Sequence, residues 1–213
     1  MGRYKRRHSA RERRGYHHGD LREALIDAAL ELISEKGPAG FTFADAARGA
    51  GVSPAAPYRH FRDRDALMAD IAKRGFDALA EDLSTAAEDG SPNPVATVER
   101  IGQAYIDFAR REPALFSAMF ESGLAPSEAA DVKAAEDRAF NVFFETCEAI
   151  SSAVKTDQRP PAMMMALHLF SLAHGIAALY SRGDGSRRTI PMSPSELLEA
   201  ATLVYLDGLG ISK

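Results

Sequence analysis

The residues of this chain most suited to chemistry are cations near its N-terminus. Residues 1–75 hold 15 Lys and Arg side chains against 10 Asp and Glu, whereas residues 76–213 hold 11 against 20, within a net charge of −4. This asymmetry predicts that a polyanion such as nucleic acid binds only the first third of the chain. Residues 1–19 contribute seven of these cations against the single Glu12: Arg3, Lys5, Arg6, Arg7, Arg11, Arg13 and Arg14.

Residues 1–19 have no apolar face and no helical periodicity, so we expect a flexible basic arm. Such an arm could follow the phosphates of DNA or enter its minor groove. Alternatively, it is a solvated tail that only adds non-specific attraction. The sequence leaves both interpretations open.

Side chains that could act as catalysts or metal ligands are few and badly spaced. His168 and His174 lie six residues apart, about 240° around a helix, so they cannot share a metal ion as an i, i+4 pair would. His17 and His18 lie next to each other in the expected flexible segment, so they are poorly placed to form a catalytic or metal site. Cys147 has no basic neighbour in the sequence to lower its pKa. No glycine-rich phosphate loop or nucleophile motif appears. We therefore predict no enzyme activity, no metal ion and no cofactor.

The segment over residues 41–67 predicts two short helices, a tight turn between them, and the start of a longer helix. Thr42 and Asp45 have the spacing of a capping box for the first short helix. Gly51 can take the positive φ needed where the chain reverses. Ser53-Pro54 is expected to cap and begin the second short helix. This is the spacing of a helix-turn-helix, whose second helix enters the major groove of DNA.

The residues after this turn carry a family resemblance. Tyr58-Arg59-His60-Phe61, followed by Arg64 and Leu67, resembles the Tyr-x-His-Phe…Lys…Leu signature of TetR-type transcriptional repressors. Tyr16–Leu21 and Ala28–Leu32 are similar to the family's usual lead-in. The resemblance extends over about residues 16–71. It implies an all-α fold, which the abundance of Ala, Leu and Glu also favours. A basic flexible arm (1–19) would precede a three-helix DNA-binding domain (20–66) and a larger helical domain for ligand binding and dimerisation (67–213).

The resemblance also implies which residues contact a double-stranded DNA operator. Tyr58 and Arg64 would bind phosphates, and Arg64 keeps the charge of the lysine that the family usually has there. Thr42 and His60 would add contacts to the DNA backbone. The remaining interface residues would be Ser53 and four that face base edges, namely Pro54, Ala55, Ala56 and Arg59. Arg59 is the only long donor among them and could read a guanine through O6 and N7.

Pro57 departs from the family pattern, which commonly has leucine at this position. It lies in the first turn of the predicted second helix, where the loss of an N–H costs little. A proline also disfavours helical geometry at the preceding residue, Ala56. We therefore expect a short or distorted recognition helix. Phe61 is expected in the core, and Tyr58 either contacts DNA or packs in the core.

Helical periodicity continues along most of the chain. Besides a first helix after Asp20, capped by Asp20 and Glu23 and ended by Gly37-Pro38, we expect helices at about 63–88, 95–111, 113–120, 128–154, 161–181 and 194–209. The helix from residue 63 would begin in the DNA-binding domain and reach into the body. It is therefore a candidate lever between two sites.

Apolar and aromatic side chains recur on the middle helices. Helical spacing of this kind is usually core packing, whereas the family resemblance implies an effector cavity between the middle helices. Leu172-Ala173-His174-Gly175 resembles the Trp-His-Gly motif of one C-terminal subclass, with Ala173 in place of the tryptophan. His174 would then be a ligand contact or a structural histidine. The candidate ligand-binding residues are Tyr105, Phe116, Met119, Phe120, Phe140, Phe143, Phe144, Phe170 and His174.

The last two long helices are apolar on nearly all sides. The resemblance implies that they pair with those of a second copy as a four-helix bundle, so we expect a homodimer; the alternative is that they only form the domain core. No apolar run approaches the ~18 residues of a membrane helix, so no membrane partner is expected. The charged N-terminus and the single Cys147 indicate a cytoplasmic protein.

These features predict a repressor that binds a palindromic operator as a homodimer and is released by a small, largely apolar effector. An alternative is a helical protein that binds small molecules without active DNA recognition.

Overall fold

The computed structural model describes residues 21–89, 93–124, 130–154, 160–181 and 190–211. The described residues contain helices and turns but no strand, as the sequence predicts. In chain order the elements are α1 (Leu21–Lys36), α2 (Phe43–Gly49), η1 (Pro57–Arg59), α3 (Arg64–Glu88), α4 (Pro94–Arg111), α5 (Pro113–Glu121), α6 (Ala130–Ala153), α7 (Ala162–Ser181) and α8 (Pro194–Gly208). The predicted basic arm lies outside the described residues.

Local hydrogen bonds begin and end several helices where the sequence predicts. The Thr42–Asp45 capping box is present at α2, and a second one joins Ser193 and Glu196 at α8. Gly51 has φ of +72° at the turn after α2, a conformation that side-chain-bearing residues rarely adopt. The expected Asp20–Glu23 box involves Asp20, which lies outside the described residues.

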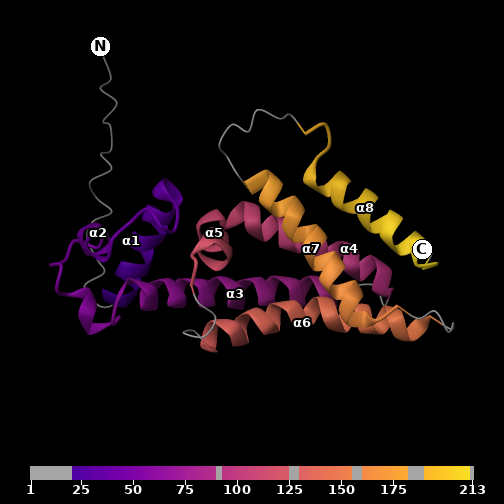
Figure 1. The fold of residues 1–213 in the computed structure, drawn as a ribbon, viewed down its shortest axis with the longest axis horizontal. Helices are drawn as coiled ribbons and strands as arrows, with labels where there is room; N and C mark the ends of the chain where they lie inside the picture. The colour runs from indigo at the N-terminus through magenta and orange to yellow at the C-terminus, as the bar shows by residue number, and fades with distance from the viewer. Residues whose placement is uncertain (1–20, 90–92, 125–129, 155–159, 182–189, 212–213) are drawn as a thin grey trace, which may run out of the picture.

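The N-terminal helices form a small domain, which we call the head. It consists of α1, α2, η1 and the beginning of α3, and Figure 1 shows it at one end of the long α3 helix. Its core is a single cluster of buried side chains: Leu25, Ile26, Ala29, Ile33, Phe41, Ala46, Phe61, Leu67, Met68, Ile71 and Ala118. The head core therefore continues into α3 as far as Ile71.

The second helix of the helix-turn-helix is short and distorted, as Pro57 led us to expect. Instead of a helix beginning at Ser53-Pro54, residues 53–56 form a turn and Pro57–Arg59 form one turn of 3₁₀ helix. Pro57 has no N–H to donate to the Ser53 carbonyl, which accepts from Ala56 N at 3.0 Å instead. Ala56 itself keeps right-handed helical geometry, with φ of −65° and ψ of −39°. The missing donor, and not a backbone clash at Ala56, thus explains the distortion.

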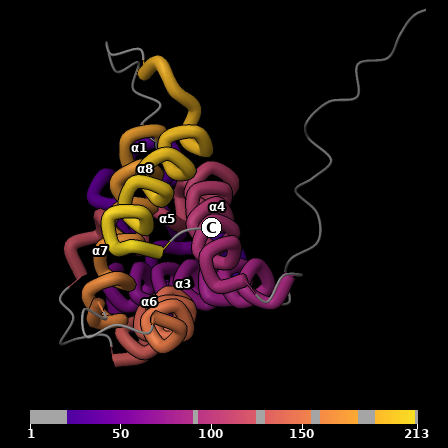
Figure 2. Tube along the Cα trace, turned by 90° about the vertical axis from the view of Figure 1, so that its right-hand side faces the viewer, coloured from indigo at the N-terminus to yellow at the C-terminus, as the bar shows by residue number. Residues whose placement is uncertain are grey.

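The larger part of the chain, which we call the body, is a helical bundle around the second half of α3. α6 lies along α3, and α7 crosses over α4 and α6 (Figure 1). α8 packs on the outer side of α4 and α7 (Figure 2). Phe76, Leu79 and Leu83 of α3 join the body core. α3 therefore belongs to both cores, as expected for a helix that links two sites.

Helix α7 corrects one prediction. Its segment Ala162–Tyr180 has a mean hydropathy of 1.6 and is long enough to cross a membrane, whereas the sequence analysis expected no such segment. No Lys, Arg, Asp or Glu interrupts residues 160–181. One side of α7, including Met165, Ala166 and Leu169, is buried in the body core. Core helices of soluble proteins can have the same length and hydropathy, so these two properties of α7 do not by themselves indicate a membrane span.

Candidate DNA-binding surface and effector site

The predicted DNA contacts of the head gather around η1. Tyr58 is 64% exposed, and Arg59 and His60 are also exposed. Ser53, Pro54 and Ala55 lie exposed on the preceding turn, and Ala56 is partly buried. Residues 53–60 thus bring a phenol, a guanidinium and an imidazole to one short surface segment. No fully formed recognition helix supports them.

Buried neighbours hold this segment on the head. Pro57 and Phe61 are buried on either side of the exposed residues, and the guanidinium of Arg22 lies over the Phe61 ring at 5.3 Å. The Tyr58 ring contacts Phe43 of α2 edge-on, with 5.0 Å between the ring centroids. Phe61 is therefore in the core, as predicted, whereas Tyr58 lies on the surface.

Arg64 binds the protein's own backbone. Its Nε donates to the carbonyl of Phe41 at 3.0 Å, and its Nη2 donates to the carbonyl of Pro38. The guanidinium also lies over the Phe41 ring at 4.8 Å and pairs with Asp65. Arg64 thus fastens the loop before α2 to the start of α3. A phosphate contact by Arg64 would have to share or replace these hydrogen bonds.

Thr42 is exposed, but its hydroxyl takes part in the capping box. Its Oγ1 donates to Asp45 Oδ2 at 2.7 Å and accepts from Asp45 N at 3.2 Å. The Thr42 hydrogen bonds lower the pKa of Asp45 to about 2, with Arg48 adding a smaller effect. Asp45 is therefore ionised at neutral pH and holds Thr42 at the N-terminus of α2.

Seven of the nine predicted ligand residues of the body form one aromatic cluster. Tyr105 of α4 lies at its centre, fully buried, and contacts Phe116, Phe143, Phe170 and His174. Phe120 and Phe140 join through further ring contacts. Two predicted members lie differently: Met119 packs against Gly75 of α3, and Phe144 is partly buried at the edge of the body core.

Phe76 of α3 is a member of this cluster that the sequence analysis missed. Its ring contacts Phe120 at 5.4 Å between centroids. Phe76 lies within the helix predicted at 63–88, but an apolar position on a long helix does not distinguish a pocket residue from a core residue. Beside Phe76, a Cβ at Gly75 would lie 2.5 Å from the Met119 sulfur, a closeness that only the structure shows. Glycine at this position permits a close approach of α3 and α5.

A polar pair lies inside the aromatic cluster. The hydroxyl of Tyr105 and Nδ1 of His174 are 2.9 Å apart, within hydrogen-bonding distance. Burial lowers the pKa of His174, with the carboxylate of Glu121 acting weakly in the opposite direction. Burial also raises the pKa of Tyr105. Both side chains are therefore neutral near pH 7.

Two grooves open near the boundary of head and body. The larger groove, of about 530 Å³, is lined by side chains of positive and negative charge, including Arg22, Asp65, Asp70, Lys73 and Asp131. The smaller, of about 250 Å³, lies between α3, α5 and α6, and its apolar wall includes Phe76, Met119 and Phe120. Of these two, the smaller groove is the one that reaches the aromatic cluster.

Helix α5 contacts both cores. Ala118 is fully buried in the head core, with Ala114 packed against the same cluster. Phe116 and Met119 on the other side belong to the body core. Figure 1 shows α5 above α3, beside the head. α5 therefore packs directly between the head core and the body core.

Within the described ranges, no group of three or more His, Cys, Asp or Glu side chains could hold a metal ion. Cys147 is buried, and burial raises the pKa of its thiol to about 12. A thiol of this kind is a poor nucleophile at neutral pH.

Comparison with known proteins agrees with both parts of this arrangement. Residues 25–71 match the family described as bacterial regulatory proteins, tetR family. Residues 98–205, half of the chain, match the tetracyclin repressor-like C-terminal domain. Tyr58 and the η1 segment lie in the first match, and the aromatic cluster lies largely in the second.

Individual relatives support the same assignment. The chain is 28% identical to an uncharacterised HTH-type transcriptional regulator, YobS of Bacillus subtilis, over 47% of this chain and 51% of YobS. It therefore aligns with about half the length of that curated relative. A solved structure of a Rhodococcus sp. RHA1 protein of unknown function is 30% identical, with a TM-score of 0.75 over 92% of this chain and 98% of that one. The regulator PfmR of Thermus thermophilus shares the fold at 19% identity, with a TM-score of 0.68 over 86% and 97% of the two chains.

Proposed function

The chain belongs to the TetR family of transcriptional regulators, and we propose that it is a cytoplasmic repressor that binds a palindromic operator as a homodimer. A small, largely apolar effector in the body would release it from DNA. We further propose that the protein has no enzymatic activity. The observation that carries the proposal is the division of the molecule: exposed donors around η1 in the head, and an aromatic cluster with a neutral polar pair in the body.

The apolar surface of α7 and α8 supports the homodimer. Large hydrophobic side chains are exposed on these two helices and just before α8: Met163, Met164, Leu167, Leu179, Met192, Leu203 and Val204. Val204 is 75% exposed. Soluble monomers rarely expose a large contiguous apolar surface, and a two-fold axis would let one such face cover its own copy. Two heads held in this way could reach successive major grooves, about 34 Å apart.

The contacts of α5 support a route from effector to DNA. A ligand that binds better to one arrangement of the body shifts the population of head positions by its difference in affinity. α3 is continuous between the two cores, and α5 packs on both. We propose that α3 and α5 together transmit the change, with α5 as the element nearest to the ligand.

Selection of DNA from a random pool by the purified full chain tests this function. We expect enrichment of a two-fold symmetric sequence, bound with strong salt dependence because Lys and Arg release counterions from phosphates. The selection is repeated with candidate apolar compounds, which should reduce the bound fraction if they are effectors. Recovery of unsymmetric sequences, or of none above background, would contradict the proposal.

One observation favours a second candidate, a helical ligand-binding protein without active DNA recognition. The recognition segment is a single 3₁₀ turn, and Arg59 is the only long donor among the predicted base-reading residues. Binding to the DNA upstream of the protein's own gene separates the two candidates. Salt-dependent binding there supports the regulator, whereas ligand binding without any DNA binding supports the alternative.

A further inference from the structure

The Tyr105–His174 pair is enclosed by flat apolar rings. The imidazole of His174 lies nearly parallel to the rings of Phe116 and Phe170, at 5.5 Å and 6.0 Å between centroids and interplanar angles of 26° and 18°. Phe120 meets the imidazole edge-on at 4.7 Å. A ligand that reached this pair would meet aromatic faces together with hydrogen-bonding groups.

The pair has hydrogen-bonding capacity beyond its internal bond. A tyrosine hydroxyl can donate one hydrogen bond and accept others, and a neutral imidazole has one donor and one acceptor nitrogen. The 2.9 Å contact uses Nδ1 of His174. The second ring nitrogen, Nε2, and the remaining capacity of the Tyr105 hydroxyl can serve a hydroxyl or carbonyl group on a ligand.

Phe120 separates this pair from the smaller groove. Its ring lines the groove of about 250 Å³ and also contacts His174. Phe120 is only partly buried, whereas Tyr105 is fully buried. Rotation of the Phe120 side chain would therefore expose the imidazole of His174 to the groove. The groove of about 250 Å³ is slightly smaller than the ~300 Å³ at which sites for drug-sized ligands begin, which favours a molecule of one or two fused rings.

The surroundings favour a neutral ligand. The side chains in ring contact with His174 are all uncharged: Tyr105, Phe116, Phe120 and Phe170. The charge that acts on His174 is the carboxylate of Glu121, which would repel an anion. At the groove rim, Lys133 and Glu136 carry opposite charges. An anion moved into this cluster would lose its hydration and meet the Glu121 carboxylate in place of a counterion, which is costly.

We propose that the effector is a small neutral aromatic molecule with one hydroxyl or carbonyl group, which displaces the Phe120 ring and hydrogen-bonds to the Tyr105–His174 pair. This inference rests on the proposed function and names the ligand class of its effector site. Displacement of Phe120 acts on α5, and Ala118 on the same helix is buried in the head core. Binding therefore disturbs the packing between body and head, which links this ligand to release of DNA.

Three probes with one ring system test the ligand class: naphthalene, 2-naphthol and 2-naphthoate. Each is titrated against the full chain at neutral pH, with naphthalene-ring fluorescence as the signal, since the chain contains no tryptophan. We expect 2-naphthol to bind about 3- to 10-fold more tightly than naphthalene, the gain typical of one buried hydrogen bond. We expect 2-naphthoate to bind more weakly than 2-naphthol. Equal affinities, no binding, or tightest binding of the carboxylate would each overturn the inference.

Variants locate the site. Tyr105→Phe and His174→Gln are each expected to reduce the preference for 2-naphthol over naphthalene, whereas Phe120→Ala should tighten binding of both probes by removing the ring that must move. Tyr205→Phe is the matched control, because Tyr205 packs against the same core but its hydroxyl lies 3.1 Å from Nδ1 of His168 and not at His174. An unchanged preference in both polar variants would place binding elsewhere.

The two proposals fail in distinguishable ways. DNA selection without ligand tests the regulator, and it does not depend on these probes. Normal operator binding together with failure of the naphthol series would reject the ligand class alone. Failure of operator binding together with the expected naphthol preference would reject the proposed function and leave the site as a ligand site.

Discussion

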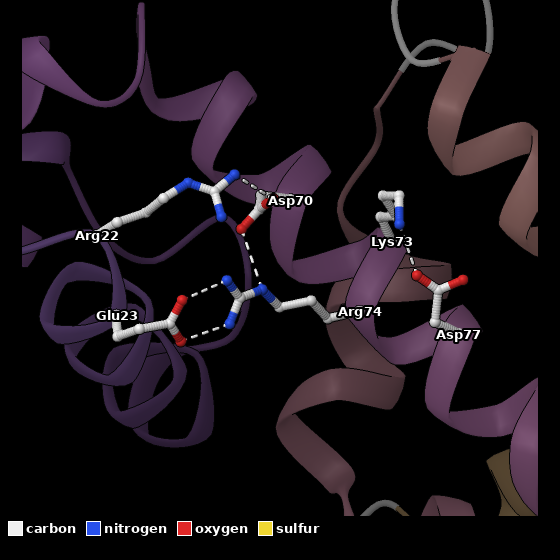
Figure 3. A network of polar contacts seen from close by, with 6 residues as sticks. All are labelled: Arg22, Glu23, Asp70, Lys73, Arg74 and Asp77. Carbon is white, nitrogen blue, oxygen red and sulfur yellow. Dashed lines mark hydrogen bonds and ion pairs between the residues drawn. The ribbon is translucent and has the colours of Figure 1, made fainter. Parts of the chain in front are cut away.

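Arg74 of α3 and Glu23 of α1 form two parallel hydrogen bonds, each 2.6 Å long, between guanidinium and carboxylate. Arg74 also donates to Asp70 at 3.1 Å, and Asp70 accepts from Arg22 of α1 at 2.7 Å. Figure 3 shows these four side chains bridging the two helices. Paired, planar contacts of this kind fix orientation as well as distance. The network therefore connects α1 to α3 in addition to the buried core of the head.

Replacement Arg74→Met should loosen this connection. It removes the hydrogen bonds to Glu23 and Asp70 but keeps a good helix former in α3. Because Arg74 and Glu23 are 36% and 47% exposed, we expect a loss of only about 1 kcal/mol of unfolding free energy. Thermal unfolding should show a midpoint about 2–4 °C lower.

The control for this replacement is Lys73→Met. Lys73 pairs with Asp77 at 2.6 Å within α3 itself, so its loss leaves the α1–α3 connection intact (Figure 3). We expect the smaller change of an i, i+4 surface pair, about 0.3–0.5 kcal/mol. Equal effects of the two variants would show that the connection between helices adds nothing to stability.

Arg59 is expected to carry sequence discrimination. Removal of a guanidinium that bonds to a guanine typically costs about 1–3 kcal/mol and relaxes specificity at that base pair. The variant Arg59→Ala should therefore bind the selected operator about 10- to 100-fold more weakly while its affinity for random DNA changes little. Competition binding against both DNAs measures the two losses separately. An equal loss on both would mean that Arg59 contacts phosphate.

Arg64 is expected to act on every DNA sequence alike. If its guanidinium contacts phosphate, Arg64→Ala should weaken all binding and reduce the salt slope by about one. The same variant loses the hydrogen bonds to the carbonyls of Phe41 and Pro38, so its thermal midpoint should fall as well. Salt titrations and unfolding curves measured on one preparation separate these effects. A lower midpoint with an unchanged salt slope would assign Arg64 to the support of the α2 loop alone.

His174 should make the stability of the protein depend on pH. Burial lowers the pKa of His174 in the folded state, so the unfolded chain binds the proton more readily. Stability should be greatest above the unfolded value of about 6.5 and should decrease as the pH falls toward the lowered folded value.

Urea unfolding across this pH range measures the effect of His174. The variant His174→Gln should lose part of the decrease at low pH, whereas His168→Gln, at an exposed position of α7, should retain it. A wild-type pH dependence in the His174 variant would assign the decrease to other groups.

The exposed face of α7 and α8 should control assembly. A single replacement Val204→Glu places a carboxylate on the most exposed large hydrophobic residue of this face, and two-fold symmetry would bring two such charges into one interface. We expect monomers in sedimentation experiments and a loss of operator binding. Ala134→Glu, at an exposed position of α6, is the control and should leave the dimer intact. A dimer that persists in the Val204 variant would place the interface elsewhere.

Much of the fold could be predicted from the sequence because its causes are local. The Thr42–Asp45 and Ser193–Glu196 boxes lie within four residues, and Gly51 marks its turn by its own conformational freedom. The helix limits follow from such caps and from apolar periodicity. Even the distortion near η1 was predictable from Pro57, although its cause is the missing N–H donor and not the backbone of Ala56.

The candidate sites were predictable as residue types but not as arrangements. The sequence placed Arg64 among the DNA contacts, and the structure shows its guanidinium bonded to carbonyls 23 and 26 residues earlier in the chain. The sequence grouped Phe144 with the aromatic cluster and left Phe76 out. In the structure Phe144 lies at the edge of the body core, and it is the Phe76 ring that contacts Phe120. Partners this distant in sequence leave no periodic signal.

The sequence by itself determined most helices, several of their caps and the helix-turn-helix spacing, because hydrogen bonds and periodicity within a few residues specify them. It also carried the family resemblance in the motif from Tyr58 to Leu67. Only the tertiary structure decided which side of the apolar α7 helix stays exposed, how Phe120 separates a groove from the Tyr105–His174 pair, and why α5 belongs to two cores. Those features depend on contacts between helices far apart in the chain, which form only when the bundle packs.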